Sequence, residues 1–426
     1  MSSEHSWSQL RIGDLIRESR VKGSNGSSAR KLTIRLYGRG VVASKDRGGS
    51  EATNYFRRKA GQFVYSKLDC LNGAFGIIPE HLDGYETTLD LPAFDFVGMV
   101  DSDWFLKTVS RPAFYGRFKF SAIGSRKANR VPTDEFLATR LSIPPLAEQR
   151  AIAEVLAAVE GAIAKREAVI NAVRDTKFSI MRELLTRGVR RDKAPMKPLP
   201  ARWILGRVAE GVTHIPSDWQ LITLAKVAKL ESGHTPDRKK ASYWNGSIPW
   251  ISLQDADALG KLTISESAES IGPEGVANSS ARILPAGTVV LQRTANVGLT
   301  SVMEAEMCTS QHFANWVCGA KIDPFYLQQV FRHMSREWLR LSAGSVLPDI
   351  YMGTFKSLQI LLPPLAEQRE IGAVGAAFDL RIEREQAALV EMRQSYLALA
   401  QELLSGRLHL PASMIERRRD KPGQAA

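Results

Sequence analysis

Basic side chains are concentrated in two stretches near the start of this 426-residue chain. Residues 20–67 carry twelve basic and two acidic side chains. Residues 107–130 carry seven basic and no acidic ones, interleaved with the rings of Phe114, Tyr115, Phe118 and Phe120. Guanidinium and ammonium groups in such a pattern suit contact with a run of phosphates. The alternative is a solvated basic face above buried aromatic side chains.

The sequence contains no recognisable catalytic or metal-binding constellation. The segment 38–43 matches GxGxxA, but no helix signal follows it, as a dinucleotide site would require. Asp237-Arg238-Lys239 lacks the two separated acidic elements of a metal-dependent nuclease. The seven histidines and three cysteines show no metal-ligand spacing. We therefore expect a binding scaffold with no cofactor or metal of its own.

Charge and composition describe an ordinary globular chain with an uneven basic surplus. The net charge is +12, and residues 1–143 contribute +7 while residues 214–362 are neutral. No apolar run is long enough to cross a bilayer, and the first residues lack the pattern of a secretory signal. The expected location is the cytoplasm, without a membrane, and a polyanion is the expected kind of partner.

A repeat organises the chain. PPLAEQR occurs at 144–150 and again at 363–369, and 17 of the 42 residues in 144–185 are identical to those 219 positions later. Each copy begins with two prolines and an early glutamate, and no proline follows for about forty residues, so each predicts a long helix. The chain is therefore a tandem duplication that alternates globules with helices.

Both predicted helices carry a heptad repeat in the same register. Eight of the ten a and d positions are apolar in each copy, which predicts a coiled coil roughly 60 Å long. The charged d positions, Arg166 and Glu385, are equivalent in the duplication. In an antiparallel pair they would lie about one turn apart, and we predict an ion pair that fixes the register. The alternatives are two helices packed on separate domains, or two charges that each reach water independently.

The predicted fold is α/β (α+β), with two globules alternating with two long helices that form a pseudo-twofold, antiparallel coiled coil. Short β-type runs and Gly, Asn or Pro turns mark both globules, which share only faint similarities such as 72–76 with 296–299. The expected segments are a first domain at 1–143, a central helix at 144–186, a basic Pro-rich linker at 187–213, a second domain at 214–362, a C-terminal helix at 363–410 and a tail at 411–426.

The sequence resembles the specificity subunits of type I restriction–modification enzymes. The resemblance rests on the two PPLAEQR helices with their LLTRG (184–188) and LLSGRL (403–408) ends, and on IPSDW (215–219), SGHTP (232–236), YWNGSIPWISLQD (243–255) and FVYSKLDCLNGAFGIIPE (63–80). It covers nearly the whole chain. Two departures are SGHTP in place of Gly-Gly-Thr-Pro and Thr-Arg-Gly in place of Thr-Gly-Arg.

The resemblance implies a DNA-binding subunit without catalysis of its own. Each globule would be a target recognition domain for one half of a bipartite, asymmetric site in double-stranded DNA, and the helices would set the spacer. Two methyltransferase (M) subunits with S-adenosylmethionine would methylate adenine N6. Two restriction/translocase (R) subunits would use ATP and Mg. An adenine must leave the base stack to be methylated, so distorted DNA is expected.

Side-chain geometry then selects candidate DNA-binding residues, because Arg and Lys suit guanine and Asn and Gln suit adenine. In the first globule the candidates are Arg30, Lys31, Arg35, Lys45, Arg47, Arg57, Arg58, Lys67, Asn72, Arg126, Lys127 and Arg130. In the second globule they are His234, Thr235, Arg238, Lys239, Lys240, Gln254, Arg293, Asn296, Gln311 and His312. Competing interpretations are a coiled-coil scaffold that binds protein or RNA, and a free-standing DNA-cleaving enzyme.

Overall fold

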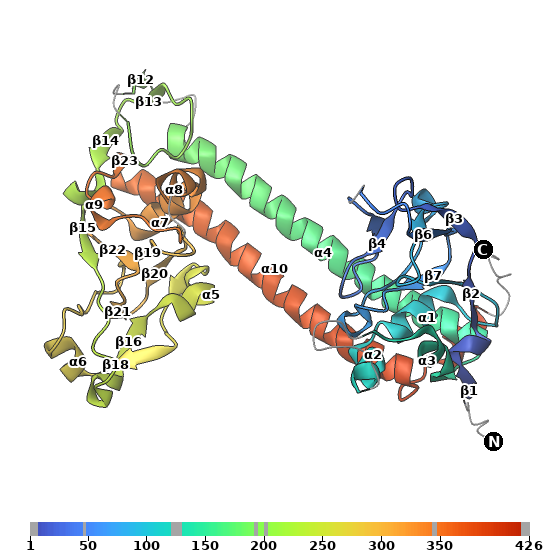
Figure 1. Ribbon diagram of the computed structural model, residues 1–426. Helices are drawn as coiled ribbons and strands as arrows, with labels where there is room; N and C mark the ends of the chain where they lie inside the picture. The colour runs from blue at the N-terminus through green and yellow to red at the C-terminus, as the bar shows by residue number, and fades with distance from the viewer. Residues whose placement is uncertain are drawn as a thin grey trace. The chain divides into compact units, whose positions relative to one another are not determined.

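The computed structural model describes residues 7–45, 48–120, 130–190, 195–199, 203–342 and 347–418. The chain divides into two compact units. Unit 1 contains the chain up to Ala164 and again from Glu391, and unit 2 contains Lys165–Val390. Each unit therefore holds one globule together with half of each of two long helices, α4 and α10 (Figure 1).

The long helices begin and end where backbone chemistry requires it. Helix α4 spans Leu146–Arg187 and α10 spans Leu365–Ser405, each starting directly after two prolines. Gly188 and Gly406 follow the last turns with φ of +75° and +74°. Glycine adopts this left-handed conformation readily and commonly ends a helix. The second helix therefore stops at Ser405, short of the predicted 410.

The two helices pair antiparallel. In unit 1 the start of α4 shares a core with the end of α10, through Leu156 and Leu403. In unit 2 the end of α4 shares a core with the start of α10, through Leu184 and Ile371. Every a and d position of the predicted heptads is buried or partly buried. The predicted antiparallel coiled coil is confirmed. Among the described residues, no helix is long and apolar enough to cross a membrane.

The globule of unit 1 is built from short strands around an aromatic core. Its largest sheet has the strand order β2 (Ile16–Ser19), β10 (Ala93–Phe96), β7 (Phe63–Tyr65) and β8 (Phe75–Ile77). A three-stranded sheet has the order β3 (Lys22–Asn25), β6 (Asn54–Arg57) and β9 (Glu86–Thr87). Two further sheets are strand pairs, β1 (Ser8–Arg11) with β11 (Arg140–Ile143) and β4 (Leu32–Ile34) with β5 (Val41–Ala43). Its helices include α1 (Ser102–Val109), α2 (Pro112–Tyr115) and α3 (Thr133–Ala138). The rings of Tyr65 and Phe136 stack at 4.6 Å in this core. Helix α11 (Ala412–Glu416) follows α10.

The globule of unit 2 has a larger central sheet. Its order is β15 (Ala228–Ser232), β22 (Phe313–Cys318), β19 (Val289–Gln292), β20 (Thr300–Met303) and β17 (Thr263–Ile264). The other sheets are β18 (Glu269–Ile271), β16 (Trp244–Ile251) and β21 (Cys308–Thr309); β14 (Gln220–Thr223) with β23 (Gln359–Leu362); and β12 (Met196–Pro198) with β13 (His214–Pro216). The helices are α5 (Ala256–Leu259), α6 (Pro273–Ala277), α7 (Pro324–His333), α8 (Ser335–Ser342) and α9 (Met352–Phe355).

The two globules share a plan that their sequences barely show. In each, an opening strand pairs antiparallel with the strand that leads into a long helix, β1 with β11 and β14 with β23. In each, an aspartate accepts a hydrogen bond at the start of a helix, Asp101 for α1 and Asp323 for α7. An antiparallel strand pair, β7–β8 or β19–β20, lies beside that helix. The predicted mixed α/β fold with two related globules is confirmed.

Candidate nucleic-acid interface

The repeated PPLAEQR motif attaches each globule to its helix. Gln149 accepts a hydrogen bond from the Asp101 backbone N–H at 2.7 Å and donates to the Pro144 carbonyl at 2.9 Å. Its equivalent, Gln368, accepts from the Asp323 N–H at 2.9 Å and donates to the Pro363 carbonyl at 2.9 Å. Both side chains are fully buried. The motif therefore fixes the start of α1 or α7 against the first turn of a long helix, which the sequence alone did not reveal.

Polar side chains set the register of the helix pair within each unit. In unit 2, Arg166 donates to Glu385 at 2.7 Å, and Lys177 donates to Asp379 at 2.5 Å. In unit 1, Tyr396 donates to Glu160. Tyr396 lies 219 positions after Lys177, and Asp379 lies 219 positions after Glu160. The duplicated positions therefore make equivalent contacts, and the Arg166–Glu385 ion pair proposed from the heptads is present.

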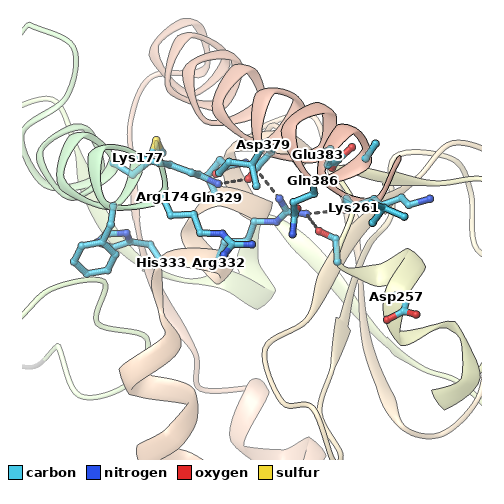
Figure 2. Close-up of a pocket in the computed structure, with 16 residues that line it drawn as sticks. Arg174, Lys177, Asp257, Lys261, Gln329, Arg332, His333, Asp379, Glu383 and Gln386 are labelled. Atoms are coloured by element: carbon cyan, nitrogen blue, oxygen red, sulfur yellow. Dashed lines mark hydrogen bonds and ion pairs between the residues drawn. The ribbon is translucent and has the colours of Figure 1, made fainter. Parts of the chain in front are cut away.

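A second set of contacts ties the globule of unit 2 to the helices (Figure 2). Arg332 and Gln329 of α7 both reach Asp379 on α10, at 2.7 and 2.8 Å. They lie beside a cavity of about 830 Å³ lined by α4, α5, α7 and α10. His333 stacks on Phe178 of α4 at 4.5 Å, and burial, followed by the charges of Lys177 and Arg182, lowers its pKa to about 4. These contacts hold α7 and the sheet beside it in place.

Two equivalent loops lie between the paired strands of the globules. The Asn72 loop (residues 66–74) joins β7 to β8, and the Asn296 loop (residues 293–299) joins β19 to β20. Gly73 and Gly298 have φ of +66° and +100°, so both loops turn through the conformation that glycine permits. The weak sequence similarity between 72–76 and 296–299 therefore reflects a shared loop position. Asn72 and Asn296 are both exposed.

Three candidate residues of the first globule come together at the Asn72 loop. The backbone of Lys67 donates to the Asp90 carbonyl at 2.9 Å and accepts from the Val131 N–H at 3.0 Å. Arg130 forms an ion pair with Asp90 at 3.3 Å. Asn72 donates to Asp69 at 3.3 Å within the loop. Lys67, Asn72 and Arg130 therefore share one surface.

A second group of candidates surrounds Glu86. The backbone carbonyl of Arg30 accepts from the Glu86 N–H at 2.8 Å, and Lys31 and Arg57 pair with Glu86 across neighbouring strands. The Arg30 guanidinium lies 4.8 Å from the Tyr85 ring, and the Lys31 ammonium donates to the Gly48 carbonyl. Lys45 follows Ser44, whose N–H donates to the Lys31 carbonyl at 2.8 Å. Lys45 and Arg57 are exposed.

Arg58 differs from its neighbour and from the expectation of DNA contact. Its side chain is 1% exposed. It donates to the Ser19 carbonyl at 2.6 Å, to the Thr87 hydroxyl at 2.7 Å and to the Leu91 carbonyl at 3.4 Å. Burial lowers its pKa to about 10. Arg58 therefore joins strands inside the globule, and we leave it out of the proposed DNA surface.

The second globule brings five candidates together around the Asn296 loop. Thr235 donates to Gln311 at 2.5 Å, and Arg293 donates to the Gln311 carbonyl at 3.1 Å. The Arg293 backbone bonds the His312 carbonyl, and the His234 N–H donates to the Thr309 carbonyl at 2.9 Å. Burial and then the Arg293 charge lower the pKa of His312. With the exposed Asn296, these side chains combine hydrogen-bond donors and acceptors on one surface.

Three of the remaining candidates of this globule, Arg238, Lys239 and Lys240, lie in the turn before Tyr243, and Gln254 lies in a short helix after β16. The Arg238 guanidinium lies 3.9 Å from the Trp244 ring. It donates two hydrogen bonds to the Glu269 carboxylate, one of them at 2.9 Å. Lys240 donates to the Tyr243 hydroxyl at 3.0 Å. The Trp250 indole donates to the His234 carbonyl at 3.0 Å and so links this turn to the Asn296 surface. Lys239 and Gln254 are exposed.

Several candidates stand apart from these groups. Arg35 is exposed in the β4–β5 turn, where its N–H donates to the Gly40 carbonyl at 2.9 Å. Arg47, Arg126 and Lys127 lie outside the described residues. For these positions the expectation of DNA contact stays a prediction.

Two exposed tyrosines beside these loops were missed in the sequence. Tyr37 is 68% exposed with a φ of +58°, and its N–H donates to the Asn72 carbonyl at 2.9 Å. Tyr351 is 78% exposed and follows Ile350, whose backbone pairs with Arg293. No periodicity marks either ring, because both lie in turns. Only their tertiary position beside the Asn72 and Asn296 loops makes them candidates.

Two kinds of reactive group can be assessed in the described part of the chain, metal-ligand clusters and cysteine thiols. No cluster of three or more His, Cys, Asp or Glu side chains in this part of the chain could hold a metal ion. Burial raises the pKa of Cys70 to about 12 and that of Cys308 to about 11, which disfavours the reactive thiolate. The surfaces around the two loops offer hydrogen bonding and positive charge.

Comparison with known proteins places the chain. Residues 216–392 match the family model of the type I restriction modification DNA specificity domain. The MjaIX specificity subunit of Methanocaldococcus jannaschii is 30% identical over 186 residues, which are 43% of this chain and 43% of that protein. The putative MjaX specificity subunit of the same organism is 22% identical over 69% of this chain and 65% of its own length. The chain thus spans less than two thirds of the length of these relatives.

Solved structures share the fold. A chain from work on complex assembly and conformational transition of the type I R-M system gives a TM-score of 0.55 at 14% identity, covering 96% of this chain and 100% of that one. The S subunit of a type I restriction-modification system from M. genitalium gives 0.53 at 11% identity, covering 95% and 97%. At such identities the likeness concerns the fold. Residues 216–392 thus match a type I restriction modification DNA specificity domain, and the chain is similar over part of its length to specificity subunits of type I restriction enzymes.

Proposed function

We propose that this chain recognises a bipartite, asymmetric sequence in double-stranded DNA, each globule recognising one half. The observation that supports this best is the pair of equivalent asparagine loops, each surrounded by exposed or partly exposed side chains that suit base edges and phosphates. Arginine can form two hydrogen bonds to guanine, and asparagine can form two hydrogen bonds to adenine. Because the helices are duplicated while the loop surfaces differ, the two half-sites should differ in sequence.

The two surfaces support different modes of contact. The first globule is strongly basic and exposes Arg35, Lys45 and Arg57. The second globule is neutral overall, and its candidate residues are connected by hydrogen bonds. We infer that the first globule contributes more phosphate contact and that the second depends more on base contact. Helices of roughly 60 Å exceed one turn of DNA, ~34 Å, and so would suffice as a spacer between half-sites.

The chemistry is proposed to come from partner subunits. The names of the relatives describe specificity subunits of type I restriction enzymes. We propose that two methyltransferase subunits dock on the helices and globules and methylate adenine N6 with S-adenosylmethionine. Two restriction subunits would supply ATP- and Mg-dependent cleavage. Since its substrate would be cellular DNA, the chain would work in the cytoplasm.

Purification with and without the methyltransferase partner tests this proposal. Adenine methylation at one interrupted sequence should appear only when both chains are present. A matched control is the partner alone, which should leave the same DNA unmethylated. Nuclease activity from this chain alone, or methylation by the partner alone at the same sequence, would overturn the proposal.

A further inference from the structure

Four arginines line a single pocket in unit 1. The cavity has a volume of about 290 Å³ and lies among α1, α2, β11 and the end of α10. We call it the arginine pocket, after Arg111, Arg117, Arg140 and Arg407. Its lining residues all belong to the described part of the chain, and none of them is acidic. Two of the arginines belong to the basic stretch 107–130 of the sequence.

Three of the four guanidinium groups form no ion pair with a described carboxylate. Arg111 donates only to the Thr108 carbonyl, at 3.2 Å, and Arg117 lies 4.9 Å from the Phe114 ring. Arg407 differs, since Glu402 accepts from it at 2.6 and 2.9 Å. Burial, and then the charges of Arg117 and Arg407, lower the pKa of Arg111 to about 10. The pocket therefore concentrates positive charge. Among the described residues, a carboxylate neutralises this charge at Arg407 only.

An anion bound among these groups would reduce the repulsion between their positive charges. The repulsion is strongest at Arg111, which is partly buried, because like charges repel more strongly where water is partly excluded. Guanidinium groups match the oxygens of phosphate in geometry and charge. A phosphate group in the pocket would therefore compensate these arginines.

A pocket in unit 2 provides the contrast. It has a volume of about 320 Å³ and is also lined by four arginines, at positions 182, 207, 336 and 340. Two glutamates line it as well, and Glu337 accepts from Arg340 at 2.8 Å and from the Gly206 N–H at 2.9 Å. The glutamates that line this pocket therefore neutralise part of the positive charge of its arginines. The arginine pocket of unit 1 lacks this compensation among its lining residues.

We propose that the arginine pocket binds a phosphate-bearing anion with the charge and size of a diphosphate group. A volume of about 290 Å³ falls just below the usual range for sites that enclose a whole ligand, ~300–1,000 Å³. It therefore suits the phosphate groups of a larger molecule. Two sources share this chemistry, the phosphates of a free nucleotide and neighbouring phosphates of the DNA backbone. The inference goes beyond sequence recognition, because it requires no base contact.

Calorimetric titration of the full chain with inorganic pyrophosphate, at constant ionic strength, tests the site. The wild type should bind with a saturable heat. The double variant Arg111→Met/Arg117→Met should bind at least about tenfold more weakly, because it loses two charge-assisted contacts. The matched control Arg17→Met/Arg417→Met removes the same charge from exposed positions of the same unit outside the pocket and should bind pyrophosphate as the wild type does.

Further variants and a competition separate folding from binding and the two ligand sources. Arg140→Gln alters an exposed side chain, so a loss of pyrophosphate affinity without a change in unfolding temperature would support the site. If pyrophosphate displaces DNA from the wild type but not from Arg111→Met/Arg117→Met, the natural ligand is backbone phosphate. If it binds without displacing DNA, the ligand is a free phosphate compound.

Two results would overturn the inference: no saturable binding of pyrophosphate by the wild type, or equal affinity in Arg111→Met/Arg117→Met. Failure of the proposed function is distinguishable from both. In that case the wild type would not bind target DNA but would still bind pyrophosphate, and Arg111→Met/Arg117→Met would still lose the pyrophosphate affinity.

Discussion

Tyr351 shows how a turn can place an aromatic ring beside the Asn296 loop. Its ring lies over Gly353, where an added Cβ would come within 2.5 Å of the ring. The preceding residue, Ile350, accepts from the Arg293 guanidinium at 3.0 Å, and Asp349 accepts from the same group at 2.8 Å. Arg293 and Tyr351 are therefore held side by side. An exposed ring in this place is suited to pack against a base.

Loss of this ring should weaken DNA binding. We expect Tyr351→Ala to reduce the affinity for target DNA by about 1 kcal/mol, the contribution typical of one aromatic contact. Tyr351→Phe keeps the ring and should stay close to the wild type. Fluorescence anisotropy with labelled duplex, at one fixed salt concentration, measures both. Equal affinities for the alanine variant and the wild type would exclude a role for the ring.

His333 should make the stability of unit 2 depend on pH. Its pKa is lowered to about 4 in the folded chain, below the usual 6.5. Between these values the unfolded chain binds more protons, so stability rises with pH from about 4 to 6.5 and is lost as pH falls. The expected change is about 3 kcal/mol. Chemical unfolding of the wild type and His333→Phe across this range should show a smaller pH effect in the variant. The same slope in both would contradict this account.

Neighbouring residues show what the sequence could not decide. Arg57 and Arg58 are alike in type and local context, yet one is exposed and the other is buried among carbonyl groups. Which of them faces solvent depends on how β6 pairs with β3 and β9, which are distant in sequence. Residue types therefore predicted that the globule has a basic surface. Which arginines lie on that surface could be decided only from the tertiary structure.

At the scale of elements, the helix register depends on a few polar contacts. Arg166 and Glu385 are 34% and 25% exposed, so their ion pair is partly screened by water. We expect a coupling free energy of about 0.5–1 kcal/mol in a double-mutant cycle with Arg166→Ala and Glu385→Ala. Denaturant unfolding of the four proteins measures it. A coupling near zero would mean that each charge is solvated independently.

The Lys177–Asp379 contact should matter more. These side chains are 13% and 8% exposed, and Asp379 also accepts from Arg332 and Gln329. Asp379→Ala would leave buried cations without their partner, and we expect a loss of about 3–5 kcal/mol in the unfolding free energy. The matched control is Glu160→Ala, the equivalent position in unit 1, where a neutral tyrosine is one of the partners. A loss no larger than that of Glu160→Ala would contradict this prediction.

The elements differ in how far their sequences predicted them. The long helices followed from heptads and prolines, because local periodicity determines them, and their starts lie within two residues of the predicted ones. The Asn72 and Asn296 loops were visible only as faint similarities. The buried hydrogen bonds of Gln149 and Gln368 were not predicted. Their backbone donors, Asp101 and Asp323, lie some fifty residues away in the sequence, and no local pattern reveals that distance.

At the scale of the whole molecule, the duplication combines repeated helices and attachments with two loop surfaces that differ from each other. The repeated motif, the register contacts and the strand pairs β1–β11 and β14–β23 recur in both units. The loop surfaces and the charge of the globules do not. A frame of this kind allows one half-site to change while the other is kept. We therefore expect a change in the Asn296 surface to alter one half of the target only.

Sequencing of N6-methyladenine across the genome of the source cell tests this central claim most directly. The comparison is between cells with the gene, without it, and with Asn296→Ala. The account predicts one bipartite motif with an unspecified gap, which disappears without the gene and loses discrimination in one half in the variant. A methylation pattern that is unchanged by deletion of the gene, or that contains only uninterrupted motifs, would contradict it.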